Sequence, residues 1–304
     1  MAITIRPLGG LGNQLFVYAT GATLAQKLGT DLVVDLIGMS TSKGRSYELG
    51  SFHSRVTKIV DSTHGAADAN RFALVKKLLR AIGQSTGAAP LVKERGFWFD
   101  PRVMQAPDGS TLDGYLQSWK YFAADAAVLK TEIRNIRNPS SWFMETKEEL
   151  FSSPPWVGIH VRRCDYLAIT QMGIATDYYY QRSIDLISQL SGVDTIRVFS
   201  DDVDLASSLP SLSKAKQVSF LRPPEDSVAL ESLILMSMAS HLVMANSSFS
   251  WWAAWLSNSE ERVVTYPRPW VDFRLVNDRD LPLPNWIGLG RENMSDALSI
   301  NVGY

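Results

Sequence analysis

The chain lacks several features that would assign it to a broad class of protein. It has one cysteine, Cys164, in 304 residues, so no disulfide framework can form, and a reducing compartment fits. The formal net charge of −1 provides no global field to attract nucleic acid, so any anion site must be local. The most apolar window, 228–245, is interrupted by Glu231 and His241. It therefore predicts a buried helix followed by a strand, not a membrane span.

The N-terminal segment also lacks the basic start and apolar core of a signal peptide, so we expect a cytoplasmic protein. One basic stretch, RFALVKKLLR at 71–80, places Lys76, Lys77 and Arg80 beside an apolar face. Such a helix suits an anionic surface, which would place the protein peripherally at the inner face of a membrane. An ordinary solvated helix face is the alternative interpretation.

The sequence does contain an alternation of strand and helix patterns, and its length suggests two domains. The opening predicts a βαβ unit made of a strand at 3–8, a glycine turn at 9–13, a helix at 14–28 and a strand at 31–36. A further strand and loop are predicted around 96–101 and 111–119. Later strands are predicted at 156–161, 195–200, 217–221, 241–245 and 262–267, and helices at 177–191, 226–239 and 250–257.

This alternation predicts an α/β fold with two Rossmann-like domains, each built on a parallel sheet covered on both faces. Chain breakers at 138–141 and 152–155 flank a short helical pattern, and they place the boundary between domains 1–150 and 151–304. Ligands of such sheets bind where the strands end at their carboxyl edge. Four polar loops, RRCD, SDD, RPPED and NSSFS, follow the later strands and are predicted to face one crevice.

Two adjacent arginines follow the apolar strand that ends in His160. Strand alternation puts Arg162 on the same side as His160, and Arg163 on the other. A planar, permanently charged guanidinium suits a phosphate, so Arg162 is predicted to meet a diphosphate while Arg163 braces the loop through Asp165. A purely structural salt bridge and a core histidine are the alternatives.

The motif FSDDVDL carries Asp201 and Asp202 directly after a strand. One of them could simply cap the following helix. Alternatively, Asp202 and Asp204 form a D-x-D pattern that can hold a divalent cation between phosphates, or a carboxylate accepts from the two adjacent donors of guanine. The nearby arginines can already neutralise phosphates, which argues against a metal.

Small polar residues precede the helix in NSSFSWWAAWL. Free backbone N–H groups and the helix dipole at Ser247 and Ser248 predict an anion site. Trp251 and Trp255 share one helix face, and we expect them in the core.

The glycine turn GGLGN, followed by Asp35 at the end of the next strand, partly matches a dinucleotide-binding fingerprint. The third glycine is missing because position 15 is leucine. The match keeps an NAD-dependent oxidoreductase as an alternative function. The nine tryptophans keep a carbohydrate-binding module as another.

Four of these segments, GGLGNQLFVYA, HVRRCDY, FSDD and HLVMANSSFSWWAAWL, occur in an order that resembles the α-1,2-fucosyltransferases of glycosyltransferase family 11. The resemblance covers most of the chain. It implies a GT-B fold, with two Rossmann-like domains facing a cleft: the first on the acceptor side, the second binding the donor nucleotide, and the last helix packing back on the first. The family's usual pattern has glycine where this chain has Cys164, and cysteine is unfavourable there if the position requires a positive φ.

The resemblance implies inverting transfer of L-fucose from GDP-L-fucose to the 2-hydroxyl of a terminal β-galactoside, in an oligosaccharide or a lipid-linked glycan. No metal or other cofactor is expected. The predicted catalytic groups are Arg162 and Asn13, and Asp165, Asp177 and Glu231 are candidate bases. The predicted donor-binding residues are Gly10, Gly12, His160, Arg163, Asp201, Asp202, Asn246, Ser247, Ser248 and Phe249.

Overall fold

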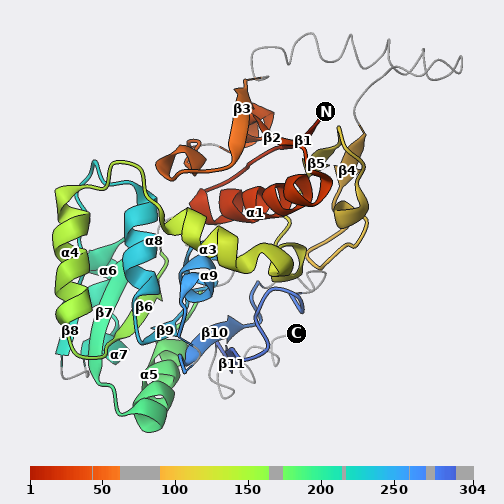
Figure 1. Ribbon diagram of the computed structural model, residues 1–304. Helices are drawn as coiled ribbons and strands as arrows, with labels where there is room; N and C mark the ends of the chain where they lie inside the picture. Colours follow the sequence, from red (N-terminus) through yellow and green to blue (C-terminus); the bar gives the residue numbers. More distant parts are fainter. Residues whose placement is uncertain are drawn as a thin grey trace, which may run out of the picture. The chain divides into compact units, whose positions relative to one another are not determined.

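The computed structural model describes residues 1–42, 44–61, 90–163, 174–213, 217–259, 261–271 and 278–291. The chain divides into two compact units, Met1–Arg137 and Asn138–Tyr304. The division falls at the first of the two breaker segments, because the helix between them, α4 (Ser141–Ser152), packs against α8 (Ala229–Ser237) in the second unit (Figure 1). A boundary at 150/151 would separate α4 from that partner.

The first unit is built on a parallel sheet in the order β3-β2-β1-β5-β4. Its strands are β1 (Ala2–Ile5), β2 (Asp31–Asp35), β3 (Val56–Val60), β4 (Leu91–Lys93) and β5 (Thr111–Asp113). Its α-helices are α1 (Leu11–Leu28) and α3 (Ala126–Arg134). Short 3-10 turns lie at η1 (Leu36–Thr41), η2 (Leu49–Ser51), η4 (Val103–Gln105), η5 (Trp119–Tyr121) and η6 (Ala123–Asp125).

Helix α1 begins at Leu11, earlier than the predicted start at residue 14. Gly10 is already its N-cap, since the backbone carbonyl of Gly10 accepts from the N–H groups of Asn13 and Gln14 at 3.0 and 3.1 Å. Gly12 and Asn13 therefore lie in the first helical turn and not in a loop. The strand predicted around 96–101 is also wrong: the strand lies earlier, at β4.

The second unit contains a parallel sheet in the order β11-β10-β9-β6-β7-β8. Its strands are β6 (Val157–Val161), β7 (Thr195–Ser200), β8 (Gln217–Phe220), β9 (His241–Val243), β10 (Val264–Arg268) and β11 (Ile287–Gly290). Its helices, besides α4 and α8, are α5 (Asp177–Ser191), α6 (Val203–Ser207), α7 (Pro210–Ser213) and α9 (Ser248–Leu256).

Helices cover both faces of this second sheet, so every residue of the central strand β6 is buried. Val157, Ile159 and Val161 belong to the apolar cluster that includes Tyr179 and Tyr180 of α5. On the other face α8 packs against α9, as right-handed crossovers in opposite directions along the sheet require (Figure 1). The tryptophans of α9 are core residues, as expected: Trp251, Trp252 and Trp255 are at most 6% exposed.

The strand order creates one topological switch point in each sheet. In the second unit the chain runs outward from β6 to β7 and β8, then returns to β9 and continues on the other side to β10 and β11. In the first unit β2 and β3 lie on one side of β1, and β5 and β4 lie on the other. Loops that leave neighbouring strands in opposite directions open a crevice at the carboxyl edge, where α/β proteins bind ligands.

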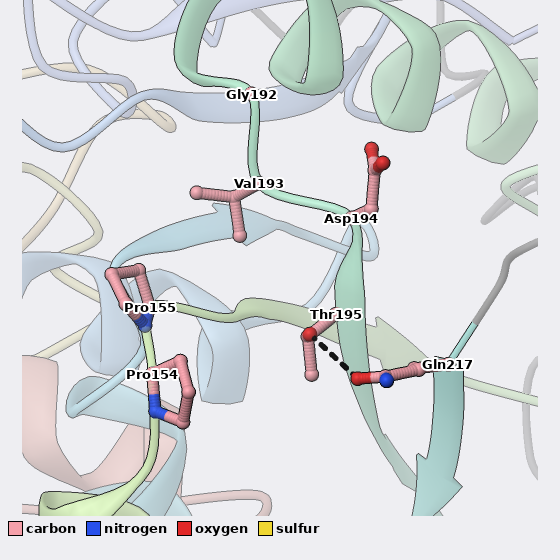
Figure 2. Close-up of a pocket in the computed structure, with 7 residues that line it drawn as sticks. All are labelled: Pro154, Pro155, Gly192, Val193, Asp194, Thr195 and Gln217. Carbon is pink, nitrogen blue, oxygen red and sulfur yellow. Dashed lines mark hydrogen bonds between the residues drawn. The ribbon is translucent and has the colours of Figure 1, made fainter.

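The opposite, amino edge of the second sheet holds a cavity of about 440 Å³ (Figure 2). The Thr195 hydroxyl bonds the Gln217 side-chain oxygen there at 3.1 Å. Its other lining residues are Pro154, Pro155, Gly192, Val193 and Asp194. This cavity lies at the other end of the strands from the switch point.

No helix in the part of the chain that the structure describes is both long and apolar enough to cross a membrane. The basic stretch at 71–80, Cys164 and the C-terminal segment expected to pack back on the first unit lie outside the described residues.

Candidate active site

The centre of the candidate site is the pair of arginines at the carboxyl end of β6. The Nε of Arg162 lies 3.1 Å from Oδ2 of Asp201, which follows the neighbouring strand β7. The other carboxylate oxygen of Asp201 accepts from the backbone N–H of Arg163 at 2.9 Å. Asp201 therefore holds both residues, and Arg162, with 18% of its side chain exposed, is fixed at the switch point.

Arg163 points to the opposite face of the sheet from His160, as the alternation predicted. Its guanidinium donates to the Ala175 carbonyl at 3.1 Å, just before α5. The His160 ring lies instead 5.6 Å from the Phe249 ring of α9, on the other face. Arg163 thus braces the segment that leads into α5. Asp165, the partner predicted for it, lies outside the described residues.

His160 is buried and uncharged at neutral pH. Burial, together with the positive charge of Arg162, lowers the pKa of His160 to about 3. Its Nδ1 has no hydrogen-bond partner within the described ranges. A neutral imidazole with an unused nitrogen beside a guanidinium is therefore present at the carboxyl end of β6.

The N-terminus of α9 lies directly after β9, on the other side of the switch point. Ser247 is the N-cap, and its hydroxyl accepts from the Phe249 N–H at 3.3 Å. Asn246 and Ser247 are buried, 2% and 5% exposed, while Ser248 is half-buried. The positive end of the α9 dipole therefore meets the same edge of the sheet as Arg162, which makes this edge suited to an anion.

Two tyrosines of α5 that the sequence motifs did not single out hold the ends of the two switch-point strands. The Tyr180 hydroxyl donates to the His160 carbonyl at 3.0 Å, and the Tyr179 hydroxyl donates to the Met244 carbonyl at 2.8 Å. Both rings are fully buried. The sequence signal was the run of three tyrosines at the start of α5, because buried tyrosine hydroxyls need partners.

Asp202 caps a helix, which was one of its predicted roles. Its side chain accepts from the Leu205 N–H at 2.9 Å at the N-terminus of α6. Asp204, the other member of the D-x-D pattern, instead faces Arg222 at 3.2 Å and is 90% exposed. Within the described ranges, no group of three or more His, Cys, Asp and Glu side chains is placed to hold a metal ion.

The candidate bases that the structure describes are engaged in structural hydrogen bonds. Glu231 is 1% exposed, and its carboxylate accepts from both the N–H and the hydroxyl of Ser140, the N-cap of α4, at 2.6 and 2.9 Å. Asp177 accepts from the Ser211 N–H at 2.9 Å, while Thr176 caps α5. The structure brings neither carboxylate into contact with Arg162 or His160 through a described hydrogen bond or ion pair.

The glycine turn belongs to the first unit, at the end of β1. Gly9 takes a left-handed φ of 68°, and its N–H donates to the Ser42 hydroxyl at 2.8 Å. The buried side chain of Gln14 holds the turn by donating to the Gly9 and Ser46 carbonyls, both at 2.8 Å. Asn13 accepts from the Gln117 amide at 2.9 Å, at the end of the neighbouring strand β5. Gly10 and Gly12 flank the same helix start.

Asp35 does not present a free carboxylate for a ribose. It is 8% exposed, lies 3.1 Å from the Arg6 Nε, and accepts from the Ile37 N–H at 3.1 Å. The acidic residue that motivated a dinucleotide site is therefore an element of local structure.

The family model of glycosyl transferase family 11 matches residues 112–290, more than half of the chain. The chain belongs to glycosyltransferase family 11. The family resemblance predicted from the four motifs is confirmed, and the NAD-dependent oxidoreductase and the carbohydrate-binding module are set aside.

Relatives of known name match this family 11 chain over nearly its whole length. An α-1,2-colitosyltransferase from Escherichia coli is 28% identical over 297 residues, which are 94% of this chain and 98% of the relative. The O-antigen biosynthesis glycosyltransferase WbnK of Escherichia coli is 26% identical, over 92% and 98%. Galactoside α-(1,2)-fucosyltransferase 2 from Oryctolagus cuniculus is 24% identical, over 97% and 78%.

Two solved structures confirm the fold. The fucosyltransferase NodZ from Bradyrhizobium superposes with a TM-score of 0.50 at 17% identity, over 84% of this chain and 93% of its own. An Arabidopsis thaliana FUT1 mutant in complex with GDP gives 0.53 at 14% identity, over 89% and 71%. The chain has the α/β fold of a GT-B glycosyltransferase, and as a member of family 11 it takes a nucleotide-sugar donor and a glycan acceptor.

Proposed function

We propose that the chain is an inverting α-1,2-fucosyltransferase that moves L-fucose from GDP-L-fucose to the 2-hydroxyl of a terminal β-galactoside. One observation carries the proposal: Arg162, the neutral His160 and the N-terminus of α9 share the carboxyl edge of the switch point between β6 and β9. The names of the relatives, α-1,2-colitosyltransferase and galactoside α-(1,2)-fucosyltransferase, support the linkage.

Inverting transfer is a single displacement in which the acceptor hydroxyl oxygen bonds to the anomeric carbon as the bond to GDP breaks, and the hydroxyl proton passes to a base or to water. Negative charge grows on the departing β-phosphate, so cations and N–H donors fixed there stabilise the transition state more than the ground state. Arg162 would supply the cation, and the amides around Ser247 and Ser248 would supply N–H donors. Because Asp201 already holds Arg162, little reorganisation is needed when the charge appears. This mechanism requires no covalent enzyme intermediate.

An assay of transfer to lactose, run in parallel with several nucleotide sugars, tests the proposal. Colitose is L-fucose without its 3-hydroxyl, so GDP-colitose is the most informative competitor to GDP-L-fucose, and UDP-galactose is the control for the base. Product from GDP-L-fucose with an α-1,2 linkage supports the proposal. Faster turnover of GDP-colitose would show that GDP-colitose is the preferred donor. Turnover of UDP-galactose alone would refute the proposal.

Activity is expected to survive excess EDTA. Arg162 would supply the positive charge at the diphosphate, and Asp202 and Asp204 of the D-x-D pattern are directed to a helix cap and to Arg222. The measurement is the initial rate before and after chelation and dialysis. Loss of activity on chelation that Mg²⁺ or Mn²⁺ restores would favour the D-x-D hypothesis instead.

Alanine substitutions of the two aspartates after β7 are expected to change different kinetic constants. One carboxylate oxygen of Asp202 accepts from the Leu205 N–H, and the other can accept from guanine. In that case Asp202→Ala weakens binding of the GDP-sugar by about 1–3 kcal/mol, which appears as a higher KM. Asp201→Ala releases Arg162 and should lower kcat. Calorimetry of GDP binding and steady-state kinetics of both variants separate the two effects. Normal GDP binding by both variants would show that neither reads the base.

The same proposal covers the acceptor and the location of the enzyme. A galactose-terminated oligosaccharide or a lipid-linked glycan is the acceptor, and the enzyme works in the cytoplasm, with peripheral contact to the inner face of the membrane. Liposome flotation with anionic lipids tests the membrane contact, and protein that stays in the dense fraction would contradict that contact.

A further inference from the structure

A second cluster lies in the first unit, at the switch point between β1 and β5. The loop after β5 begins at Gly114, and its Gln117 donates to Asn13 in the first turn of α1, just after the glycine turn that follows β1. β4 pairs with β5 on the other side, and Glu94 comes directly after it. Three loops therefore meet at the carboxyl edge of this sheet, where α/β folds bind ligands.

Two aromatic rings of this cluster are stacked on each other and partly exposed to solvent. The rings of Phe97 and Tyr115 lie 5.8 Å apart with an interplanar angle of 21°, and the two residues are 37% and 38% exposed. A stacked pair that leaves this much apolar surface exposed beside polar groups is typical of a binding site rather than of core packing. Pyranose rings present an apolar C–H face of matching size.

The backbone that carries Tyr115 is held in an uncommon conformation. Gly114 has a φ of 152° and Leu116 a φ of 53°, although leucine rarely adopts a left-handed backbone. Glu94 holds the turn, since its Oε2 accepts from the Leu116 N–H at 2.9 Å. A Cβ on Gly114 would lie 2.7 Å from the Glu94 Cβ, so the turn needs glycine to approach this closely. Strained backbone that the surroundings fix in place is often found at ligand sites.

Glu94 is half-buried and keeps hydrogen-bonding capacity for a ligand. Its Oε1 lies 3.3 Å from the Tyr121 hydroxyl, which also accepts from the Asp100 N–H at 2.8 Å. Burial raises the pKa of Glu94 to about 7, with the charge of Asp100 contributing and the hydrogen bonds from Leu116 and Tyr121 opposing. Asp100 also forms an ion pair with the guanidinium of Arg102. A carboxyl group of this kind can accept from sugar hydroxyls.

The geometry points to a glycan-acceptor subsite in which the face of a β-galactoside packs on Phe97 and Tyr115 while its hydroxyls donate to Glu94. This inference rests on the proposed function for the identity of the acceptor. Unlike the donor site, it uses residues of the first unit alone. It also places the start of α1, through the Gln117–Asn13 hydrogen bond, beside the acceptor.

The test measures acceptor and donor binding separately in the full-length protein. Phe97→Ala and Tyr115→Ala should each raise the KM for lactose about tenfold, the loss expected when a central aromatic contact is truncated. Glu94→Gln, which can still accept from Leu116, should also raise it. The KM for GDP-L-fucose and the Kd for GDP should stay unchanged in all three. Leu91→Ala is the matched control, because Leu91 is 49% exposed at the amino end of β4, away from the cluster.

Saturation-transfer NMR with lactose, methyl β-D-galactoside and N-acetyllactosamine, recorded without donor, keeps this inference distinct from the proposed function. A saturation-transfer signal that is seen with the unsubstituted protein and lost in the aromatic variants supports the subsite, even if GDP-L-fucose is never turned over. Normal turnover with an unchanged acceptor KM in the aromatic variants would overturn the subsite and leave the function intact. The absence of a saturation-transfer signal with all three galactosides would also overturn it. So would lower melting temperatures with an unchanged acceptor KM, which would mean that the rings pack within the chain.

Discussion

Arg162→Ala is expected to lower kcat by about 10²–10³-fold, the loss typical when one preorganised donor to a developing anion is removed. The guanidinium is held by Asp201 at the switch point, beside the neutral His160. Charge on the departing diphosphate grows during the reaction, so the interaction strengthens in the transition state and its loss appears mainly in kcat. Steady-state kinetics with GDP-L-fucose and lactose measure it.

Two further variants make the Arg162 prediction specific. Arg162→Lys should rescue kcat poorly, because an ammonium cannot keep the Asp201 contact and give a planar two-point contact to phosphate. Arg163→Ala should instead lower the melting temperature, since its guanidinium ties β6 to the Ala175 carbonyl before α5. If Arg162→Ala retains near-normal kcat while a well-folded Arg163→Ala protein is inactive, the two roles are reversed.

Arg262→Met is expected to lower the free energy of unfolding of the second unit by about 3 kcal/mol. Arg262 is 5% exposed, and its guanidinium donates to the Met236 and Ser237 carbonyls at 3.3 and 3.2 Å and to the Ala253 carbonyl at 3.3 Å. These carbonyls lie at the C-terminal ends of α8 and α9, where a cation also complements the helix dipoles. Burial lowers the pKa of Arg262 to about 9, so it remains charged at neutral pH.

Urea unfolding followed by tryptophan fluorescence measures the Arg262 effect, because Trp251, Trp252 and Trp255 lie on α9. Arg222→Met is the matched control. Its ion pair with Asp204 is exposed, 66% and 90%, so its loss should change the free energy by no more than about 0.5 kcal/mol. Equal effects of the two substitutions would contradict the argument, since they would mean that other donors or water satisfy the carbonyls.

Local patterns in the sequence determined most of the second unit. The helix predicted at 177–191 and the strand at 195–200 have the predicted bounds in the structure, because capping residues and apolar periodicity act over a few residues. The side-chain alternation after β6 also placed Arg163 on the opposite face from His160. The four motifs in order were enough to indicate the family, which the match over 112–290 confirms.

The partners of the polar side chains were decided only by the tertiary structure. The Arg163 N–H and Asp201 are 38 residues apart, and Ser140 and Glu231 are 91 apart, so no local pattern relates them. From the sequence alone Glu231 remained a candidate base, because its burial against the start of α4 results from the packing of segments far apart in the chain. The strand order likewise decided which loops are neighbours: it puts the RPPED loop at the outer strand β8, away from the NSSFS loop after β9. Sequence sets what each segment can form, whereas long-range packing sets which charged groups are paired and which remain available to a ligand.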